Sequence, residues 1–404
     1  MLKAHSLLYS VYVCLIVAIL CGALLYFATL YNQLNLFYNT NEQLYIQNQS
    51  AVNFALGSAL KEESVFITDT SNVKSEIKTK PYGLLNLLLV SSYIKSDTVT
   101  SSHFVGSYPK EKICLYLSRV SKPMSYSGLV KLVGNKQLPS HTIKEFYASN
   151  TPNQLTTSGT TTLSETLLPE INQKYKSMSV SVPTQLRSFQ SVERKVDSVY
   201  YNSFQNETIE IQLANPILEN IVIKGNFILY AKDSIQVGRS AILEDVILKS
   251  PKITFKEDFQ GAIQAFSSEK IHLEKGVNLQ YPSVLCVYNS SENESIITVS
   301  EECKIIGAVV LFGNQVNTID LNTIIFHKKT LLIGDVYSYG KLMMEGKIYG
   351  SVYTNRLFHK TESTSYENCV MNCEIDVTKK PSYFVSLPIF EEINVNYGVY
   401  KKVL

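Results

Sequence analysis

Apolar residues are distributed very unevenly along the chain. The first block, residues 6–31, is almost continuously apolar, and no Asp, Glu, Lys or Arg occurs between Lys3 and Glu42. A helical run of this length can cross a hydrocarbon core of about 30 Å. The pattern therefore predicts a transmembrane helix over residues 7–31, preceded by a short tail over residues 1–6.

This apolar block is expected to be a retained anchor and not a signal peptide. A signal peptide has an apolar core of about 7–15 residues followed by small residues, whereas this run is longer and ends in Leu30 and Tyr31. Lys3 precedes the block and no Lys or Arg follows until Lys61, so the positive-inside rule predicts a cytoplasmic tail and an exported remainder. The predicted lipid-facing residues are Leu7, Leu8, Val11, Leu15, Ile16, Ile19, Leu20, Leu24, Leu25, Phe27 and Leu30.

The apolar pattern continues beyond the membrane edge. Neither Gly nor Pro occurs from Ala23 to Leu56, and Gly57 is a suitable helix stop, so one helix is expected to extend over residues 32–60. The extension is either a linker that lifts a domain off the membrane or a spine that packs against other copies or partners. Its candidate packing face has near-heptad spacing and consists of Leu34, Phe37, Leu44, Ala51 and Phe54.

A second pattern, of short strands, starts near residue 204. Segments of three to five residues with alternating apolar positions begin, for example, at Ser234, Lys270 and Ser295, and Gly, Asn, Asp, Ser or Lys bounds them. The cadence recurs with imperfect periods of about 18 to 36 residues, which favours a parallel β-helix over residues 204–354. A β-sandwich with closely spaced turns is the alternative.

The predicted fold class is mainly β, with an N-terminal transmembrane and spine α-helix followed by a parallel β-helix, or β-solenoid, domain. The remaining regions are expected to be a small β-rich region that packs on the solenoid (61–147), a polar linker or insertion (148–203), and a C-terminal cap and tail (355–404). Within the tail, residues 388–404 have an alternating pattern that predicts an added edge strand.

Composition adds two constraints. The 404 residues carry a formal net charge of only +2, so no overall field attracts nucleic acid, and the lipid bilayer is the first expected partner. The sequence contains 26 Tyr, no Trp and only 6 His, a balance that favours strands after the anchor.

The motifs that would indicate catalysis were not found. The Asp residues of the repeat region are not closely paired, and the sequence has no HExxH, phosphate-binding loop or nucleophile elbow. We therefore predict no enzyme activity and no catalytic, cofactor-binding or metal-binding residue. Seven Cys occur, and Cys369 and Cys373 are close enough in sequence for a small-loop disulfide if that region is exported, with free thiols as the alternative.

A resemblance to known families accompanies these patterns. The short basic tail, the apolar helix and the continuation LYIQNQSAVNFALGSAL resemble the N-terminal segment of PilX-like minor pilins and pseudopilins, although no prepilin cleavage site precedes the helix and no acidic residue lies early in it. The repeat cadence of residues 204–354 resembles the polymer-forming β-helix of bactofilins. The combination is similar to envelope proteins of the Bacteroidota type.

The resemblance implies a non-enzymatic structural or assembly protein of a bacterial envelope. It would lie in the inner membrane, with the C-terminal domain periplasmic or extracellular, and would contact other envelope or pilus-like subunits through the spine helix. Two alternatives remain open at the level of sequence. One is a membrane-tethered β-helix that binds or cleaves a polysaccharide. A groove with three or more acids and stacked Tyr would support this alternative. The other is a bactofilin-like polymer scaffold.

Overall fold

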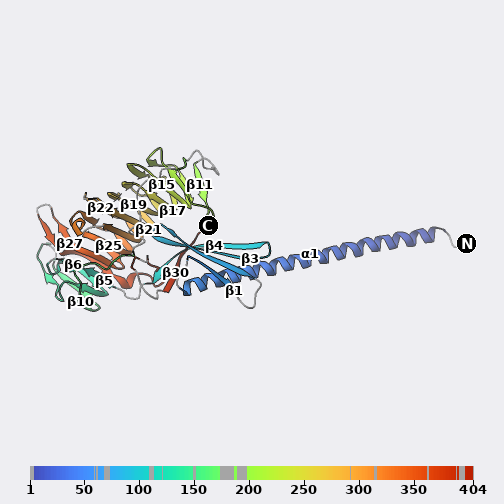
Figure 1. Cartoon of the computed structure of the whole chain (residues 1–404), viewed down its shortest axis with the longest axis horizontal. Helices are drawn as coiled ribbons and strands as arrows, with labels where there is room; N and C mark the ends of the chain where they lie inside the picture. The colour runs from blue at the N-terminus through green and yellow to red at the C-terminus, as the bar shows by residue number, and fades with distance from the viewer. Residues whose placement is uncertain are drawn as a thin grey trace. The chain divides into compact units, whose positions relative to one another are not determined.

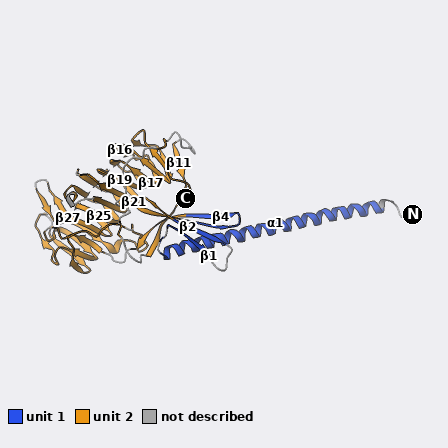
Figure 2. Cartoon of the chain, viewed as in Figure 1, with its two compact units in different colours: residues 1–78, 89–101 blue, residues 79–88, 102–404 orange. Residues whose placement is uncertain are grey.

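The structure is a computed structural model of the 404-residue chain. It describes residues 4–58, 60, 62–67, 73–108, 113–120, 122–148, 152–172, 186–188, 198–291, 293–313, 316–361, 364–387, 389–390 and 396–403. Two compact units are present. Unit 1 comprises Met1–Lys78 and Leu89–Ser101, and unit 2 comprises Thr79–Leu88 and Ser102–Leu404 (Figure 2).

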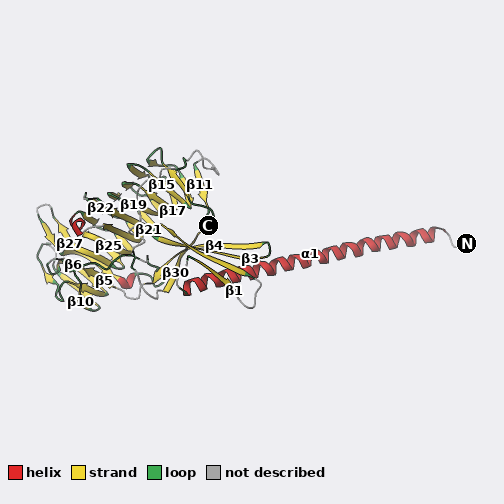
Figure 3. Cartoon of the chain, viewed as in Figure 1, coloured by secondary structure: helices red, strands yellow, loops and turns green. Residues whose placement is uncertain are grey.

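One long helix dominates unit 1. Helix α1 (Ala4–Gly57) runs without interruption through the predicted anchor and the predicted extension, and it ends at the Gly that the sequence marks as a stop (Figure 1). In the part of the chain that the structure describes, the other helical elements are the short 3₁₀ turns η2 (Val316–Asp320) and η3 (Val377–Lys379), and strands make up most of the rest (Figure 3). The chain is therefore mainly β with one long N-terminal apolar helix.

Five strands form an antiparallel sheet. The strands, in their order across it, are β1 (Glu63–Ile67), β2 (Lys74–Tyr82), β3 (Leu85–Ile94), β4 (Asp97–Tyr108) and β30 (Asn396–Val403). Two-residue connections at 83–84 and 95–96 join β2, β3 and β4 as hairpins, which only antiparallel strands allow. Strand β30 lies at the edge beside β4, which confirms the edge strand predicted near the C-terminus; residues 391–395 of that prediction lie outside the described residues.

Unit 2 contains a large sheet of 25 strands, whose parallel pairings follow three ladders. Ladder 1 contains, in pairing order, β11 (Val199–Asn202), β14 (Val222–Gly225), the first residues of β17 (Ile242–Lys249), β19 (Gln260–Ser267), β21 (Asn278–Asn289), β23 (Lys304–Gly313) and β25 (Leu331–Met344), then β26 (Lys347–Tyr349), the later residues of β29 (Cys369–Asp376) and β6 (Ser125–Val133), and β9 (Gln154–Ser158).

The two other ladders share the long strands with ladder 1. Ladder 2 contains β12 (Ile209–Gln212), β15 (Phe227–Tyr230), the later residues of β17, β19, β21 and β23, the middle of β25, then β27 (Val352–Lys360), β5 (Ile113–Leu117), β7 (Asn135–Leu138) and β10 (Thr161–Leu163). Ladder 3 contains β13 (Ile217–Leu218), β16 (Ser234–Val237), β18 (Lys252–Phe255), β20 (Lys270–Leu273), β22 (Ser295–Val299), β24 (Asn322–Phe326) and the ends of β25 and β27. It also includes the start of β29, which pairs with the start of β6, and β8 (Lys144–Glu145), which pairs with the same part of β6. An antiparallel strand, β28 (Ser365–Glu367), pairs with the end of β27.

The core consists of columns of apolar side chains that stack from strand to strand. In ladder 3 a buried column runs through Ile235, Ile253, Ile271, Ile297, Ile324 and Leu342, each in register with the next. Their spacings of 18 to 27 residues are the imperfect period seen in the sequence. Branched side chains suit such columns because each lies directly over its equivalent on a pleated surface.

Glycine allows the chain to turn between ladder 1 and ladder 2. Gly307, Gly334 and Gly350 stack at this corner with φ of +150°, +139° and +159°. A Cβ at Gly334 would overlap the carbonyl oxygen of Gly307, and one at Gly350 would overlap that of Gly334. The corner therefore requires residues without a side chain.

The order of strands in the ladders differs from their order in the chain, and this corrects three predictions. Strands β5 to β10, within 113–163, continue the ladders beyond β27 and β29. The β-rich region predicted at 61–147 to pack on the solenoid, and the linker predicted at 148–203, therefore contribute strands to the ladders themselves, while 173–185 and 189–197 lie outside the described residues. The predicted cap at 355–404 is wrong where β29 joins the ladders. A parallel edge accepts any strand with the right alternation, whatever its place in the chain.

Candidate functional site

Two regions carry functional potential: helix α1 and a groove in unit 2. By length and composition, α1 can cross a membrane, and its most apolar window is entirely unburied by protein. All eleven residues predicted to face lipid are exposed. A helix of 54 residues is about 80 Å long, whereas a bilayer core takes about 30 Å. Much of α1 therefore has to lie outside any bilayer that its first half crosses.

The last turns of α1 are buried against strands of unit 1. Leu44, Asn48, Ala51, Val52 and Ala55 are at most 5% exposed and follow helical spacing. Of the predicted packing face, Leu44 and Ala51 therefore lie in this intramolecular stripe. The structure does not bring the five predicted residues together on one contact surface.

The other three predicted packing residues are exposed to different extents. Leu34 is 48% exposed and Phe37 is 56% exposed, while Phe54 is half-exposed and its ring contacts Phe66 of β1 at 4.9 Å between centroids. Other large apolar side chains of the same stretch are exposed as well: Tyr31, Leu36, Tyr38, Tyr45 and Ile46. Exposed large apolar side chains thus occur along residues 31–46 of the helix, although Leu44, in the same stretch, is buried.

The buried amide of Asn48 connects the helix to the strands. Asn48 donates through Nδ2 to the carbonyl oxygens of Val90 (2.9 Å) and Val99 (3.2 Å) and to Ser92 Oγ (3.3 Å). Its Oδ1 accepts from Ser101 Oγ at 2.6 Å. Every polar position of this side chain is therefore used, across β3 and β4. Sequence reasoning missed Asn48, because an Asn in a polar stretch of helix predicts solvent exposure.

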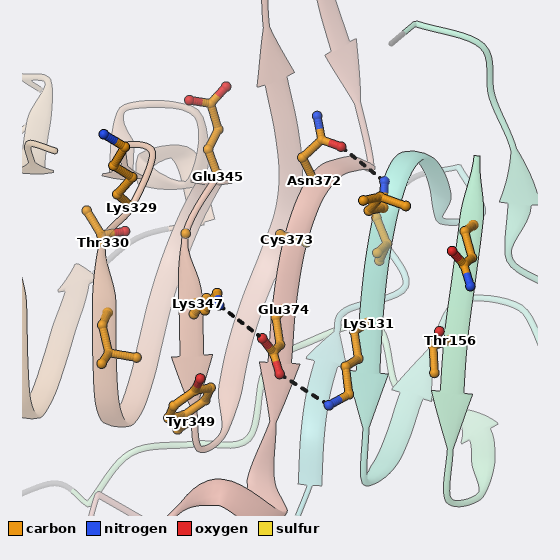
Figure 4. Close-up of a pocket in the computed structure, with 15 residues that line it drawn as sticks. Lys131, Thr156, Lys329, Thr330, Glu345, Lys347, Tyr349, Asn372, Cys373 and Glu374 are labelled. Atoms are coloured by element: carbon orange, nitrogen blue, oxygen red, sulfur yellow. Dashed lines mark hydrogen bonds and ion pairs between the residues drawn. The ribbon is translucent and has the colours of Figure 1, made fainter. Parts of the chain in front are cut away.

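The groove has a volume of about 780 Å³ and lies across β25, β26, β29, β6 and β9 of ladder 1 (Figure 4). Alternate residues of a strand point to opposite faces. Leu332, Ile348 and Ile375 point into the core, so their neighbours line the groove. The floor is one row of paired residues: Leu331, Lys347, Glu374, Lys131 and Thr156.

Charge in the groove converges on one carboxylate. Glu374 accepts from Lys379 Nζ at 2.6 Å and from Lys131 Nζ at 3.2 Å, and Lys347 Nζ lies 3.8 Å away (Figure 4 shows Lys131 and Lys347). Lys131 also binds Asp376 at 3.0 Å. Burial alone would raise the pKa of Glu374, but the hydrogen bonds from Lys379 and Lys131 lower it. Hydrogen bonds to Asp376 and Glu374 raise the pKa of Lys131, so the cluster is charged at neutral pH.

The groove does not have the composition that would favour glycan cleavage. Its lining contains two acids, Glu345 and Glu374, and one aromatic residue, Tyr349. Lys379 Nζ lies over the ring of Tyr349, 4.7 Å from the ring centroid. Glu374 is held by lysines, which suits a fixed charge and not a general acid, since an acid must be protonated at the working pH. Among the described residues, no group of three or more His, Cys, Asp or Glu could hold a metal ion.

The sequence did not reveal this groove, because its residues come from three distant segments. On its own strand, each of Lys131, Lys347 and Glu374 alternates with buried residues. Only the register of the strand pairs β26–β29 and β29–β6 shows that the three side chains are neighbours. The alternating pattern marked them as outward-facing, but it gave no pairing.

The predicted disulfide is not found. Cys369 and Cys373 are both buried free thiols. Cys369 pairs in register with Ser125 in ladder 3, whereas Cys373 pairs with Val130 in ladder 1, so the two residues lie on either side of the corner at Asn372. The prediction assumed one loop, and the structure has a strand that changes ladder.

No protein-family model and no curated protein matches the sequence of this chain, and no solved structure matches its fold.

Proposed function

We propose that this protein is a non-enzymatic assembly protein of a bacterial envelope, similar in design to a minor pilin. Helix α1 would anchor it in the inner membrane with its N-terminus in the cytoplasm, and the rest of the chain would be periplasmic or extracellular. The exposed apolar surface of residues 31–46 would pack against helices of neighbouring subunits.

The observation that carries this proposal is the division of α1 into parts with different surroundings. Its last turns are buried on an antiparallel sheet, and its first half is unburied and apolar. Beyond the length that a bilayer needs, residues 31–46 still expose seven large apolar side chains among polar ones: Tyr31, Leu34, Leu36, Phe37, Tyr38, Tyr45 and Ile46. Exposed apolar patches on such a scale are typical of surfaces that bind another protein or a membrane.

We further propose that the three ladders are the faces of a parallel β-helix, which this anchor would present outside the membrane. Two observations support closure. The long strands β17, β19, β21, β23 and β25 each take part in two or three ladders. In addition, the apolar columns of ladders 1, 2 and 3 belong to one continuous cluster of buried residues. A β-sandwich would need antiparallel pairs, and among the described strands of the 25-stranded sheet the antiparallel pair is β27 with β28.

Site-specific photo-crosslinking in native membranes tests the assembly role. A photoreactive residue at Leu34, Phe37 or Ile46 should yield crosslinks to other envelope subunits or to a second copy. The matched control is Ile242, which is also a large exposed apolar residue (51%) but lies on β17. It should give no such product.

Crosslinking at Leu34, Phe37 and Ile46 to lipid alone, with no protein product, would contradict the assembly role. A cysteine placed in the tail and labelled from outside the cell would contradict the orientation, because the positive-inside rule assigns that end to the cytoplasm.

A further inference from the structure

We propose that the groove of ladder 1 binds an acidic polysaccharide, with an anionic sugar over the lysines that surround Glu374. This site is separate from α1 and goes beyond the assembly role. It would bind the polymer without cleaving it.

The first argument is charge. Lys131, Lys347 and Lys379 share the carboxylate of Glu374, and Asp376 neutralises only Lys131. The groove lining holds three lysines, Lys131, Lys329 and Lys347, against two acids, Glu345 and Glu374, although Lys329 also pairs with Glu302 at 3.2 Å. The positive groups are also more accessible to a ligand than the negative one, because the side chain of Lys347 is 59% exposed and that of Glu374 is 13% exposed. A ligand therefore meets ammonium groups first, and charge-assisted hydrogen bonds to a carboxylate or sulfate are among the stronger polar contacts.

The second argument is shape. The floor crosses five strands, and neighbouring strands are about 4.8 Å apart, so it extends for about 19 Å. The groove runs across the strands and presents a new side chain at each step. This geometry suits an extended polymer, because each successive strand places a further side chain along its length. The side chains of Gln154 and Thr156 on β9 stand at one end of the groove and that of Asn372 on the middle strand, and these amide and hydroxyl groups suit a ligand rich in hydroxyl groups.

Nucleic acid fits the groove less well. Single-stranded nucleic acid is held by aromatic side chains on which bases stack. Tyr349 is the one aromatic residue in the groove lining, and Lys379 lies over its ring. The chain as a whole carries a net charge of only +2.

The test is a binding titration with the full-length protein in detergent micelles. The probes are polygalacturonate and alginate as acidic polysaccharides, dextran as a neutral polysaccharide, and polyglutamate as an acidic peptide chain. At least one polyuronate should bind, and dextran and polyglutamate should bind at least tenfold more weakly. Partner subunits are absent from this assay, so its failure would leave the proposed assembly role untouched.

Variants locate the site. Lys347→Gln should weaken polyuronate binding about tenfold, the usual scale for one charged hydrogen bond, and Lys347→Glu should weaken it further. Lys270→Gln is the matched control, because Lys270 is an exposed lysine on β20 of ladder 3. Equal unfolding temperatures for all variants would show that the fold is kept. No polyuronate binding, equal binding of polyglutamate, or equal loss in Lys347→Gln and Lys270→Gln would each overturn the proposal.

Discussion

Replacing Asn48 by alanine tests how α1 is attached to the strands of unit 1. Alanine would leave the carbonyl oxygens of Val90 and Val99 and the hydroxyl of Ser101 without this buried partner. An unsatisfied buried polar group costs about 1–3 kcal/mol, and the strand carbonyls keep bonds from their neighbours, so about 1 kcal/mol for each of the three groups is reasonable. We expect a loss of about 3 kcal/mol in the stability of unit 1.

Native-state hydrogen exchange of the full chain in detergent measures this loss locally. A change of about 3 kcal/mol should speed exchange of the β3 and β4 amides in residues 89–101 roughly 150-fold. The control is Asn53→Ala, one and a half turns further along α1, where the side chain is exposed; it should change exchange by less than about threefold. Equal effects of the two variants would refute the role assigned to Asn48, as would protection of residues 89–101 that Asn48→Ala leaves intact.

Three further predictions concern unit 2 and the end of α1. Gly334→Ala should destabilise the ladders by about 3 kcal/mol in chemical unfolding, because φ is positive and the new methyl group meets a carbonyl, whereas Gly57→Ala, with open space around it, should change stability by less than about 0.5 kcal/mol. Asp335→Asn should cost about 3 kcal/mol by breaking a buried ion pair with Lys380 at 2.8 Å. Burial opposes ionisation of Asp335, but Lys380 lowers its pKa below the ordinary 3.8, so this stabilisation is present above about pH 4 and is lost as the pH falls through the lower native pKa. Burial raises the pKa of Cys114 to about 12, so iodoacetamide at pH 8 should modify this thiol only after unfolding; rapid modification in the native protein would count against its burial.

The helix and the repeats could be read from the sequence because each leaves a local signal. An apolar run without Gly or Pro predicts α1 up to Gly57, and the structure ends the helix at that residue. Alternation with a recurring period predicts the strands, and Ile235, Ile271 and Ile297, which mark that period, stack in one column. Both signals depend on residues that lie close together in the chain.

Pairings between distant segments leave no such signal. The groove depends on β26, β29 and β6 lying side by side, and the last of these precedes the others by more than 200 residues. A turn rich in Gly and Pro around residues 122–140 is equally consistent with a hairpin or with a coil of the stack. Lys131 and Glu374 therefore could not be matched from sequence, although each could be assigned to the outward face of its own strand.

The end of the stack shows why strand order mattered for the interpretation. In ladder 2 the buried column passes from Val336 to Val352 and then to Leu115, and the next position in register is Lys136. Its side chain is buried, and its ammonium group donates to the carbonyl oxygens of Gly134 (3.0 Å) and Ser158 (2.6 Å).

Burial lowers the pKa of Lys136, as expected for a cation at the end of an apolar column. A stack of repeats needs a polar end to remain soluble, and here that end comes from residues that precede the repeats in the chain. Strands within 113–163 thus follow β27 and β29 in the ladders, and β29, which lies in the C-terminal segment expected to be the cap, supplies one of the edges that they join. Strands β5 and β6 pair with β27 and β29, so this end of unit 2 can join the rest of the sheet only after residues 352–376 have been made.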